Sequence, residues 1–230
     1  MLSISTTREW QSSHPGAIIG LLELSNVGGI SSSPELDARK REVESMLRQK
    51  YQGFTRKDFL ALPILSAYDR YYNRFDKTYH VQLQLESIVL KGKNLPNVSP
   101  LVDSNFMAEV ETFLLSAGHD ADKLAGPVSM DVSREGESMM QMNGVAKVIR
   151  AGDMIMRDAQ DIACSILYGQ DNRSPITPET SHVLYVTYAP PGVPAVAVEG
   201  HLRMIESNIR LFAGAAALDQ LRLLMADDSS

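Results

Sequence analysis

The sequence is poor in the features that mark secreted and membrane proteins. Its 230 residues include one cysteine, Cys164, so no disulfide can form within the chain, and such cysteine usage suits a reducing compartment. No apolar run approaches the ~20 residues that a membrane-spanning helix requires, and the first residues lack the apolar segment of a signal peptide. We therefore expect a cytoplasmic protein that has no membrane partner.

The common catalytic signatures are missing as well. The chain has no P-loop, no dinucleotide-binding fingerprint, no Cys-x-x-Cys pair, no His-Glu-x-x-His run and no Ser-His-Asp order. We therefore expect neither a covalent nucleophile nor a bound metal or cofactor.

Positive charge is scarce. Lysine and arginine together number 22 against 28 for aspartate and glutamate, which leaves a net charge of −6 with histidine neutral. Because an extended nucleic-acid footprint needs clustered Lys and Arg to neutralise phosphates, the composition argues against a DNA-binding surface. It leaves room only for a local basic patch.

What the sequence does contain is enough apolar material, 44% of its residues, for a substantial core. Helical patterns dominate the first half, and strand-like runs dominate after Val128. The sequence predicts one α+β unit over residues 1–230, with a helical N-terminal half, an antiparallel β-rich C-terminal half, a long closing helix and a frayed tail at 227–230. Apolar residues from Leu202 to Ala216 repeat at heptad-like spacing, which suits packing on a sheet or in a homodimer.

Local signals define several elements more closely. The short apolar run at 17–24 predicts a buried strand, and Ser33 before Pro34 predicts the N-cap and first turn of a helix. Thr55 and Asp58 have the spacing of a capping box at the start of another helical region.

Asn143-Gly144 between apolar runs is the strongest hairpin signal in the chain, and it predicts a type I′ turn. The run at 78–93 fits the periods of both a strand and a helix. Further strands are expected at 153–157, 162–168 and 182–189.

The stretch at 95–126 is organised like a binding site. Asp103 or Ser104 is expected to cap a helix that Gly118 ends. Polar side chains gather near the two ends of this helix, namely Asn105 and then His119, Asp120, Asp122 and Lys123.

Four pieces of sequence occur in an order that resembles a known family. The first piece lies within 95–126 and consists, in order, of Val-Asp, an Asn followed by an aromatic residue, a helix and an Asp-x-Asp run. The other three pieces are GESMMQMNG, IMRDAQDIACSILYGQD and TPETSHVLYVTYA. Over residues 95–189 they resemble the tRNA-binding and editing domain of the phenylalanyl-tRNA synthetase beta subunit, the B3/4 domain. The earlier runs HPGAIIGLLEL and PILSAYDRYYNRF resemble free-standing proteins built around this domain. The resemblance implies the fold of that domain and favours a helix at 78–93.

The resemblance also implies a site at which water attacks the ester between an amino acid and the tRNA 3′ end. Asn105 matches an asparagine of the editing pocket. Asp171 aligns with a glutamate that, in the family, recognises a tyrosine hydroxyl, and the side chain of Asp171 is one methylene shorter than that glutamate. The family's histidine falls near Ala117, two positions before His119, and its Ala-x-Gly-Gly pocket floor corresponds to residues 163–166. The expected catalytic residues are Asn105, His119 and Asp171, and the expected substrate-binding residues are Asp103, Asp120, Asp122, Arg173 and Thr180.

Each candidate also has a simpler explanation. Asn105 and Asp103 belong to residue types that cap helices, and His119, Asp120 and Asp122 fit a solvated turn after a glycine. Asp171 and Arg173 fit an ordinary polar loop between apolar runs, and Thr180 fits the turn into the next strand. Two functions therefore stay open. One is a hydrolase that clears mischarged tRNA in trans, and the other is a non-catalytic binding module for tRNA, a protein partner or an amino-acid-like ligand.

Basic residues next to tyrosines precede the predicted site. They are Arg70, Arg74, Lys77, Lys91 and Lys93. If their helices flank residues 95–126, they form a positive rim that holds a tRNA 3′ end, since basic and aromatic side chains neutralise phosphates and stack on bases. The alternative is an ordinary amphipathic helix whose arginine stems cover apolar surface.

Overall fold

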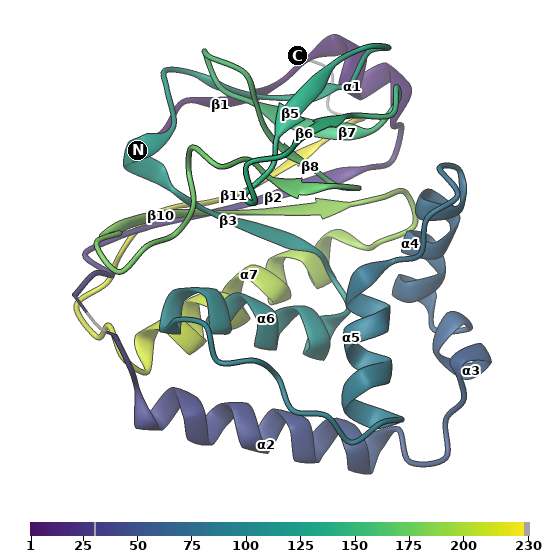
Figure 1. Cartoon of the computed structure of the whole chain (residues 1–230), viewed down its shortest axis with the longest axis vertical. Helices are drawn as coiled ribbons and strands as arrows, with labels where there is room; N and C mark the ends of the chain where they lie inside the picture. The colour runs from purple at the N-terminus through teal and green to yellow at the C-terminus, as the bar shows by residue number, and fades with distance from the viewer. Residues whose placement is uncertain (30, 228–230) are drawn as a thin grey trace.

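A computed structural model describes residues 1–29 and 31–227 and has three layers (Figure 1). In the view of Figure 1, a five-stranded sheet lies above a four-stranded sheet, and helices α6 and α7 lie beneath the second sheet. The remaining long helices complete the lower part of the molecule. None of the helices in the described ranges is long and apolar enough to cross a membrane.

Most helices lie in the first half of the chain and most strands in the second half. The helices are α1 (Arg8–Ser13), α2 (Pro34–Lys50), α3 (Arg56–Leu60), α4 (Pro63–Asn73), α5 (His80–Val89), α6 (Pro100–Thr112), the 3-10 turn η1 (Ala121–Lys123) and α7 (Ala195–Arg210). The strands are β1 (Ile4–Thr6), β2 (Ile18–Ser25), β3 (Ser116–Asp120), β4 (Val128–Val132), β5 (Ser138–Met140), β6 (Ala146–Val148), β7 (Met154–Arg157), β8 (Ile162–Ser165), β9 (Gly169–Gln170), β10 (His182–Ala189) and β11 (Ala217–Met225).

The strands form two main sheets and a hairpin. The four-stranded sheet has the order β11-β2-β10-β3 and is antiparallel throughout. The five-stranded sheet has the order β1-β4-β7-β8-β9, and its one parallel pair is β1 with β4. The predicted α+β class with an antiparallel-rich second half is confirmed.

Strand β2 is buried on both faces, as its continuous apolar run predicts. Ile19 and Leu21 belong to the core shared with the five-stranded sheet, whereas Leu22 belongs to the core on the α7 side. Gly20 allows α7 to approach closely, because a Cβ at this position would lie 2.6 Å from Val198. Because successive side chains of β2 point to opposite faces of the sheet, the strand contributes to the cores on both sides and so links the three layers.

Several local predictions are confirmed. Ser33 caps α2 by accepting a hydrogen bond from the N–H of Leu36 at 3.1 Å. Asp58 accepts a hydrogen bond from the N–H of Thr55 at 2.8 Å at the start of α3. The ambiguous run at 78–93 contains α5, so the helical alternative is correct.

The predicted hairpin is formed by β5 and β6, but its turn is not of type I′. A type I′ turn needs positive φ at both central residues, and here Gly144 has a φ of 78° while Asn143 does not share that conformation. The Asn143 side chain instead accepts a hydrogen bond from Val145 N–H at 3.0 Å. This local bond stabilises the alternative turn.

Helix α6 begins and ends earlier than predicted. It starts at Pro100, whose fixed φ suits the first helical position, so Asp103 and Ser104 lie inside the helix and do not cap it. It ends because Phe113 adopts a left-handed conformation with a φ of 66°. The predicted stop, Gly118, lies in β3.

A strand, not a helix, closes the described chain. The predicted long helix is α7, but it ends at Arg210, and the heptad positions Phe212 and Ala216 lie in the connection that follows. The chain then pairs with β2 as β11. Of the tail that we expect to fray, residues 228–230 lie outside the described part.

His182 of β10 contacts both the neighbouring strand β2 and the 3-10 turn η1. Its Nδ1 lies 2.8 Å from Asp122 and its Nε2 lies 2.8 Å from Glu23. Burial by itself lowers the pKa of His182, but these two carboxylates outweigh burial and hold the pKa above the usual 6.5. A raised pKa contributes stability that is complete below the unfolded pKa and is lost as pH rises through the folded pKa.

We expect His182→Gln to lower the free energy of unfolding most at acidic pH, below about 6.5, and progressively less at alkaline pH, where the wild-type imidazole is also neutral. Urea unfolding of both proteins over a pH series measures this difference. Asp122→Asn, which removes one of the two partners, should act in the same direction. A loss that is the same at every pH contradicts the ion-pair explanation.

Candidate functional site

A cavity of about 330 Å³ lies at the free edge of β3. Val102, Asn105 and Phe106 of α6 form one wall, and the segment around β8 and β9 forms the opposite wall. Most of its lining is apolar, and only a few polar groups reach it. This composition is usual for sites that bind small ligands.

Strand β3 is the edge strand of the four-stranded sheet. In an antiparallel pair, successive residues direct their N–H and C=O groups alternately toward and away from the neighbouring strand. Tyr188 N–H donates to Leu115 C=O at 3.0 Å, which fixes this alternation for the whole strand. The residues whose peptide groups point away from β10 are therefore Ser116, Gly118 and Asp120.

Two of these three outward residues have hydrogen-bond partners, and the third has none. Side chains of α6 bind both peptide groups of Ser116, and Asp120 N–H donates to Ser174 C=O at 2.9 Å. Gly118 lines the cavity, and no residue in the described ranges hydrogen-bonds to its N–H or C=O. The edge of β3 thus offers the cavity one free peptide donor and one free peptide acceptor.

Asn105 supplies a second free acceptor. Its Nδ2 donates to Ser116 C=O at 3.2 Å and to Glu109 Oε1 at 3.3 Å, which leaves Oδ1 without a partner among the described residues. Burial raises the pKa of Glu109 to about 8, although hydrogen bonds from Ser116 and Asn105 oppose this shift. Glu109 is therefore largely uncharged at pH 7 and places little negative charge beside the cavity.

His80 lines the cavity from the first turn of α5. Its Nδ1 lies 3.3 Å from the Tyr72 hydroxyl, and that hydroxyl donates its own hydrogen to Ile166 C=O at 2.6 Å. Nδ1 therefore carries the imidazole proton, and the lone pair is on Nε2. His80 as a whole residue is exposed, and desolvation by the surrounding protein lowers its pKa to about 4. The imidazole is neutral at pH 7.

The wall opposite α6 includes three of the four positions at 163–166 that correspond to the family's pocket floor. They are Cys164, Ser165 and Ile166. Burial raises the pKa of the Cys164 thiol to about 12, so the sulfur stays protonated and is a poor nucleophile.

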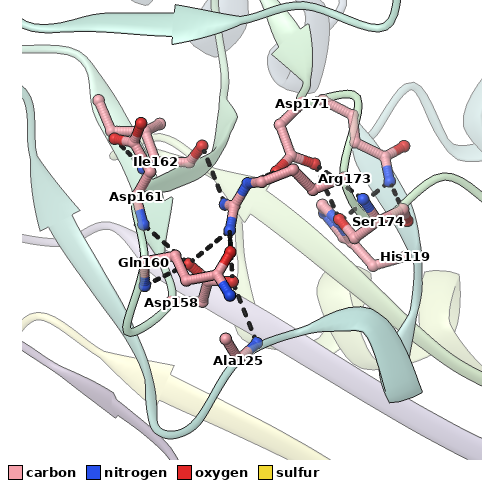
Figure 2. A network of polar contacts seen from close by, with 10 residues as sticks. His119, Ala125, Asp158, Gln160, Asp161, Ile162, Asp171, Arg173 and Ser174 are labelled. Atoms are coloured by element: carbon pink, nitrogen blue, oxygen red, sulfur yellow. Dashed lines mark hydrogen bonds and ion pairs between the residues drawn. The ribbon is translucent and has the colours of Figure 1, made fainter.

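His119, Asp171 and Arg173 lie together in a polar network (Figure 2). None of them lines the cavity. Ser174 Oγ is 2.8 Å from His119 Nδ1 and 2.9 Å from Asp171 Oδ1. Arg173 forms ion pairs with Asp171 at 2.7 Å and with Asp158 at 2.9 Å. His119 is fully buried in β3, so the solvated-turn explanation is wrong for it, and burial lowers its pKa to about 3.

The other predicted substrate-binding residues also lie outside the cavity lining. Asp103 forms a buried ion pair with Lys40 at 2.5 Å. Asp120 accepts a hydrogen bond from the Thr180 hydroxyl at 2.8 Å, and both side chains are buried. Asp122 alone among these acids is exposed, as a solvated turn predicts. Asn105 is thus the one predicted site residue that the described structure brings to the cavity.

The predicted basic residues do not line the cavity either. Arg74 packs over Tyr71 with its guanidinium carbon 5.5 Å from the ring centre, and Arg70 donates to Ser66. Tyr71 and its neighbour Tyr72 are buried in the core. This arrangement agrees with the amphipathic-helix alternative.

Lys91 and Lys93 lie at the far end of α5. His80 starts this ten-residue helix and lines the cavity, while the two lysines follow its last turn, about 15 Å further along the axis. Both side chains are exposed there. They cannot form a rim at the cavity mouth in this conformation.

One cluster of possible metal ligands lies on the four-stranded sheet. Ligand atoms of Glu23, His182 and Asp219 are within 4.8 Å of one another. Protein donors already occupy the Glu23 carboxylate, however, because Leu2 N–H and the Gln220 amide bond to it. We interpret the cluster as a hydrogen-bonded support for the sheet.

Reasoning from the sequence missed His80 and Gly118. His80 belongs to no motif, and its position at a helix start facing a cavity depends on the packing of α5 against distant strands. Gly118 carried a signal, since a glycine within a strand marks close approach or an open edge. That signal was hidden because the segment was predicted to end a helix.

Residues 66–197 match the family model of the B3/4 domain. Because the match spans more than half of the chain, the chain belongs to the B3/4 domain family, and the resemblance seen in the sequence is confirmed at this level. Among curated proteins, none has a sequence that matches the chain.

One similar solved structure is an N-terminal fragment of the phenylalanyl-tRNA synthetase beta-subunit from Pyrococcus horikoshii. The TM-score is 0.46 at 8% sequence identity, and the match covers 96% of this chain and 50% of the other. The chain therefore spans about half the length of that fragment.

Gly118→Ala tests the packing at the cavity. A Cβ at this position would lie 2.8 Å from Ile176 and 2.9 Å from the Tyr185 ring, and both residues line the cavity. We expect the variant to lose about 1–3 kcal/mol of unfolding free energy through overpacking, measured by denaturant unfolding. Gly200→Ala in α7 is the matched control, since its Cβ meets nothing within 4 Å. A Gly118→Ala protein as stable as that control would show that the ring does not cover this position.

Proposed function

We propose that this chain receives the aminoacyl end of a tRNA in the cavity beside β3 and hydrolyses the ester of a wrongly attached amino acid in trans. The observation that carries the proposal is the pair of unpartnered groups on two residues that line a mostly apolar cavity, the Gly118 peptide and Asn105 Oδ1. Membership of the B3/4 family adds support, but function is argued from the site because one fold serves many functions.

The polar groups match the chemistry of an aminoacyl ester. Such a group carries an α-ammonium, which is a donor, beside a carbonyl, which is an acceptor. Gly118 C=O and Asn105 Oδ1 would accept from the ammonium, and Gly118 N–H would donate to the carbonyl. The apolar walls, among them Phe106 and Ile166, would surround the amino-acid side chain. Unpaired polar groups in a pocket favour ligands that pair them.

Hydrolysis needs an attacking water and little else, because the ester is already reactive. In the proposed reaction the water oxygen bonds to the ester carbonyl carbon while His80 Nε2 takes the water proton. Gly118 N–H stabilises the oxyanion. The bond from carbon to the tRNA 3′ oxygen then breaks, and that oxygen receives the proton from His80. The free amino acid and the tRNA leave.

A second candidate is a non-catalytic binding module for tRNA, a protein partner or an amino-acid-like ligand. It is favoured by the burial of His119 and Asp171 outside the cavity lining, where Ser174 and Arg173 hold these two expected catalytic residues away from a ligand. It also requires only the cavity and its unpartnered groups.

The experiment incubates the protein with tRNAs that each carry one of a panel of amino acids. We expect release of one amino acid or a small set, and a loss of about 100-fold in His80→Gln, at the low end of the roughly 10²–10⁴ that a general base contributes because the lowered pKa makes His80 a weak base. Asn105→Ala should also lose release. Asn172→Ala is the control, because Asn172 is exposed and does not line the cavity.

The panel also separates the two candidates. Esters that stay intact while the tRNA or an aminoacyl nucleoside is retained, with weaker retention in Asn105→Ala, support the binding module. If no ester is cleaved and nothing is retained at low salt, the hydrolase fails, and so does the binding module for tRNA or an amino-acid-like ligand.

A further inference from the structure

We propose that Lys77, Tyr168 and Lys147 form the surface that holds the phosphates next to the RNA 3′ end when its aminoacyl group enters the cavity. This inference rests on the proposed function and names the part of the protein that contacts the nucleic acid. Of the basic residues predicted to form a rim, it keeps Lys77 and replaces Arg70, Arg74, Lys91 and Lys93.

Two lysines from distant segments meet at one aromatic ring. Lys77 Nζ lies 4.5 Å from the centre of the Tyr168 ring, and Lys147 Nζ lies 5.2 Å from it. The two ammonium groups are therefore no further apart than the sum of these distances. Lys77 comes from the connection between α4 and α5, Lys147 from β6 and Tyr168 from the connection between β8 and β9.

Neither ammonium forms an ion pair with an acid of the described chain. Two other cations do, as Arg150 pairs with Asp76 and Arg173 with Asp158. In a protein with a net charge of −6, two neighbouring unpaired lysines create a local positive potential. The two ammonium groups repel each other when no anion is bound. A phosphate placed beside both of them relieves this repulsion, so the patch attracts phosphate.

The patch adjoins the cavity mouth. Tyr168 directly precedes Gly169, which lines the cavity, and Lys77 lies three residues before His80, which also lines it. Two hydrogen bonds hold Tyr168 in position, because its N–H donates to Ser165 Oγ at 3.2 Å and its C=O accepts from Gln141 at 3.0 Å. An aminoacyl group inside the cavity therefore leaves the next nucleotides of its RNA beside the two lysines.

The hairpin that carries Lys147 also exposes apolar side chains. Met142, Val145 and Val148 each keep more than half of their surface accessible, and Met142 lines the cavity. Apolar and aromatic surface beside lysines is the combination that binds single-stranded RNA, because bases stack on it while the cations neutralise the backbone.

The test measures binding of an uncharged RNA minihelix with a single-stranded 3′ end at several salt concentrations. Lys77→Glu with Lys147→Glu is compared with the matched pair Lys91→Glu with Lys93→Glu, which changes net charge by the same amount at the far end of α5. We expect the first pair to weaken binding about tenfold and to reduce the salt slope by about 1.4, which corresponds to two phosphates of a single strand. The second pair should change neither value. Unfolding curves check that both pairs stay folded.

The outcomes separate this inference from the proposed function. If wild type binds the minihelix and the Lys77/Lys147 pair has no more effect than the Lys91/Lys93 pair, the surface is wrong while the cavity function stands. Release of amino acids in the tRNA panel without measurable binding of the minihelix also overturns the surface. If the panel shows neither release nor retention, the proposed function fails, and this inference fails with it.

Discussion

The site depends on an edge strand whose outward peptide groups are covered at both ends and open in the middle. An uncovered sheet edge is costly and is normally blocked. On β3, side chains of α6 bind Ser116, and the carbonyl of Ser174 binds Asp120. Only Gly118 between them is left without a partner in the described chain, and it opens into the cavity. The remainder of the fold holds this edge at a fixed distance from α6 on one side and from β8 and β9 on the other.

Burial controls the chemistry around that edge. It keeps Glu109 largely uncharged and the Cys164 thiol protonated, and it keeps His119 neutral within β3. His80 is neutral too, but it faces the cavity and has a free lone pair on Nε2. The two histidines show how accessibility, and not residue type alone, decides which one is suited to move a proton.

Much of the fold could be predicted from local signals, and less of the site could. The cap at Ser33, the doubly buried run of β2 and the hairpin at Asn143-Gly144 each depend on neighbours in sequence, so the pattern is sufficient. Strand β11 was missed because its pairing with β2 joins segments almost 200 residues apart. In the site, Asn105 was expected to line the cavity and does so. His119 and Asp171 satisfied the same sequence criteria, but packing directs them into a network with Ser174 and Arg173, which no spacing along the chain reveals.

Hydrogen exchange at the Gly118 amide tests the central claim most directly. In the free protein we predict fast exchange at Gly118 between slowly exchanging amides at Ala117 and His119, whose N–H groups face β10. A non-hydrolysable 3′-aminoacylamino-adenosine carrying the amino acid selected in the tRNA panel should slow exchange at Gly118 and shift its resonance. A Gly118 amide that is already protected without ligand, or that is unchanged when the analogue binds, would contradict the account.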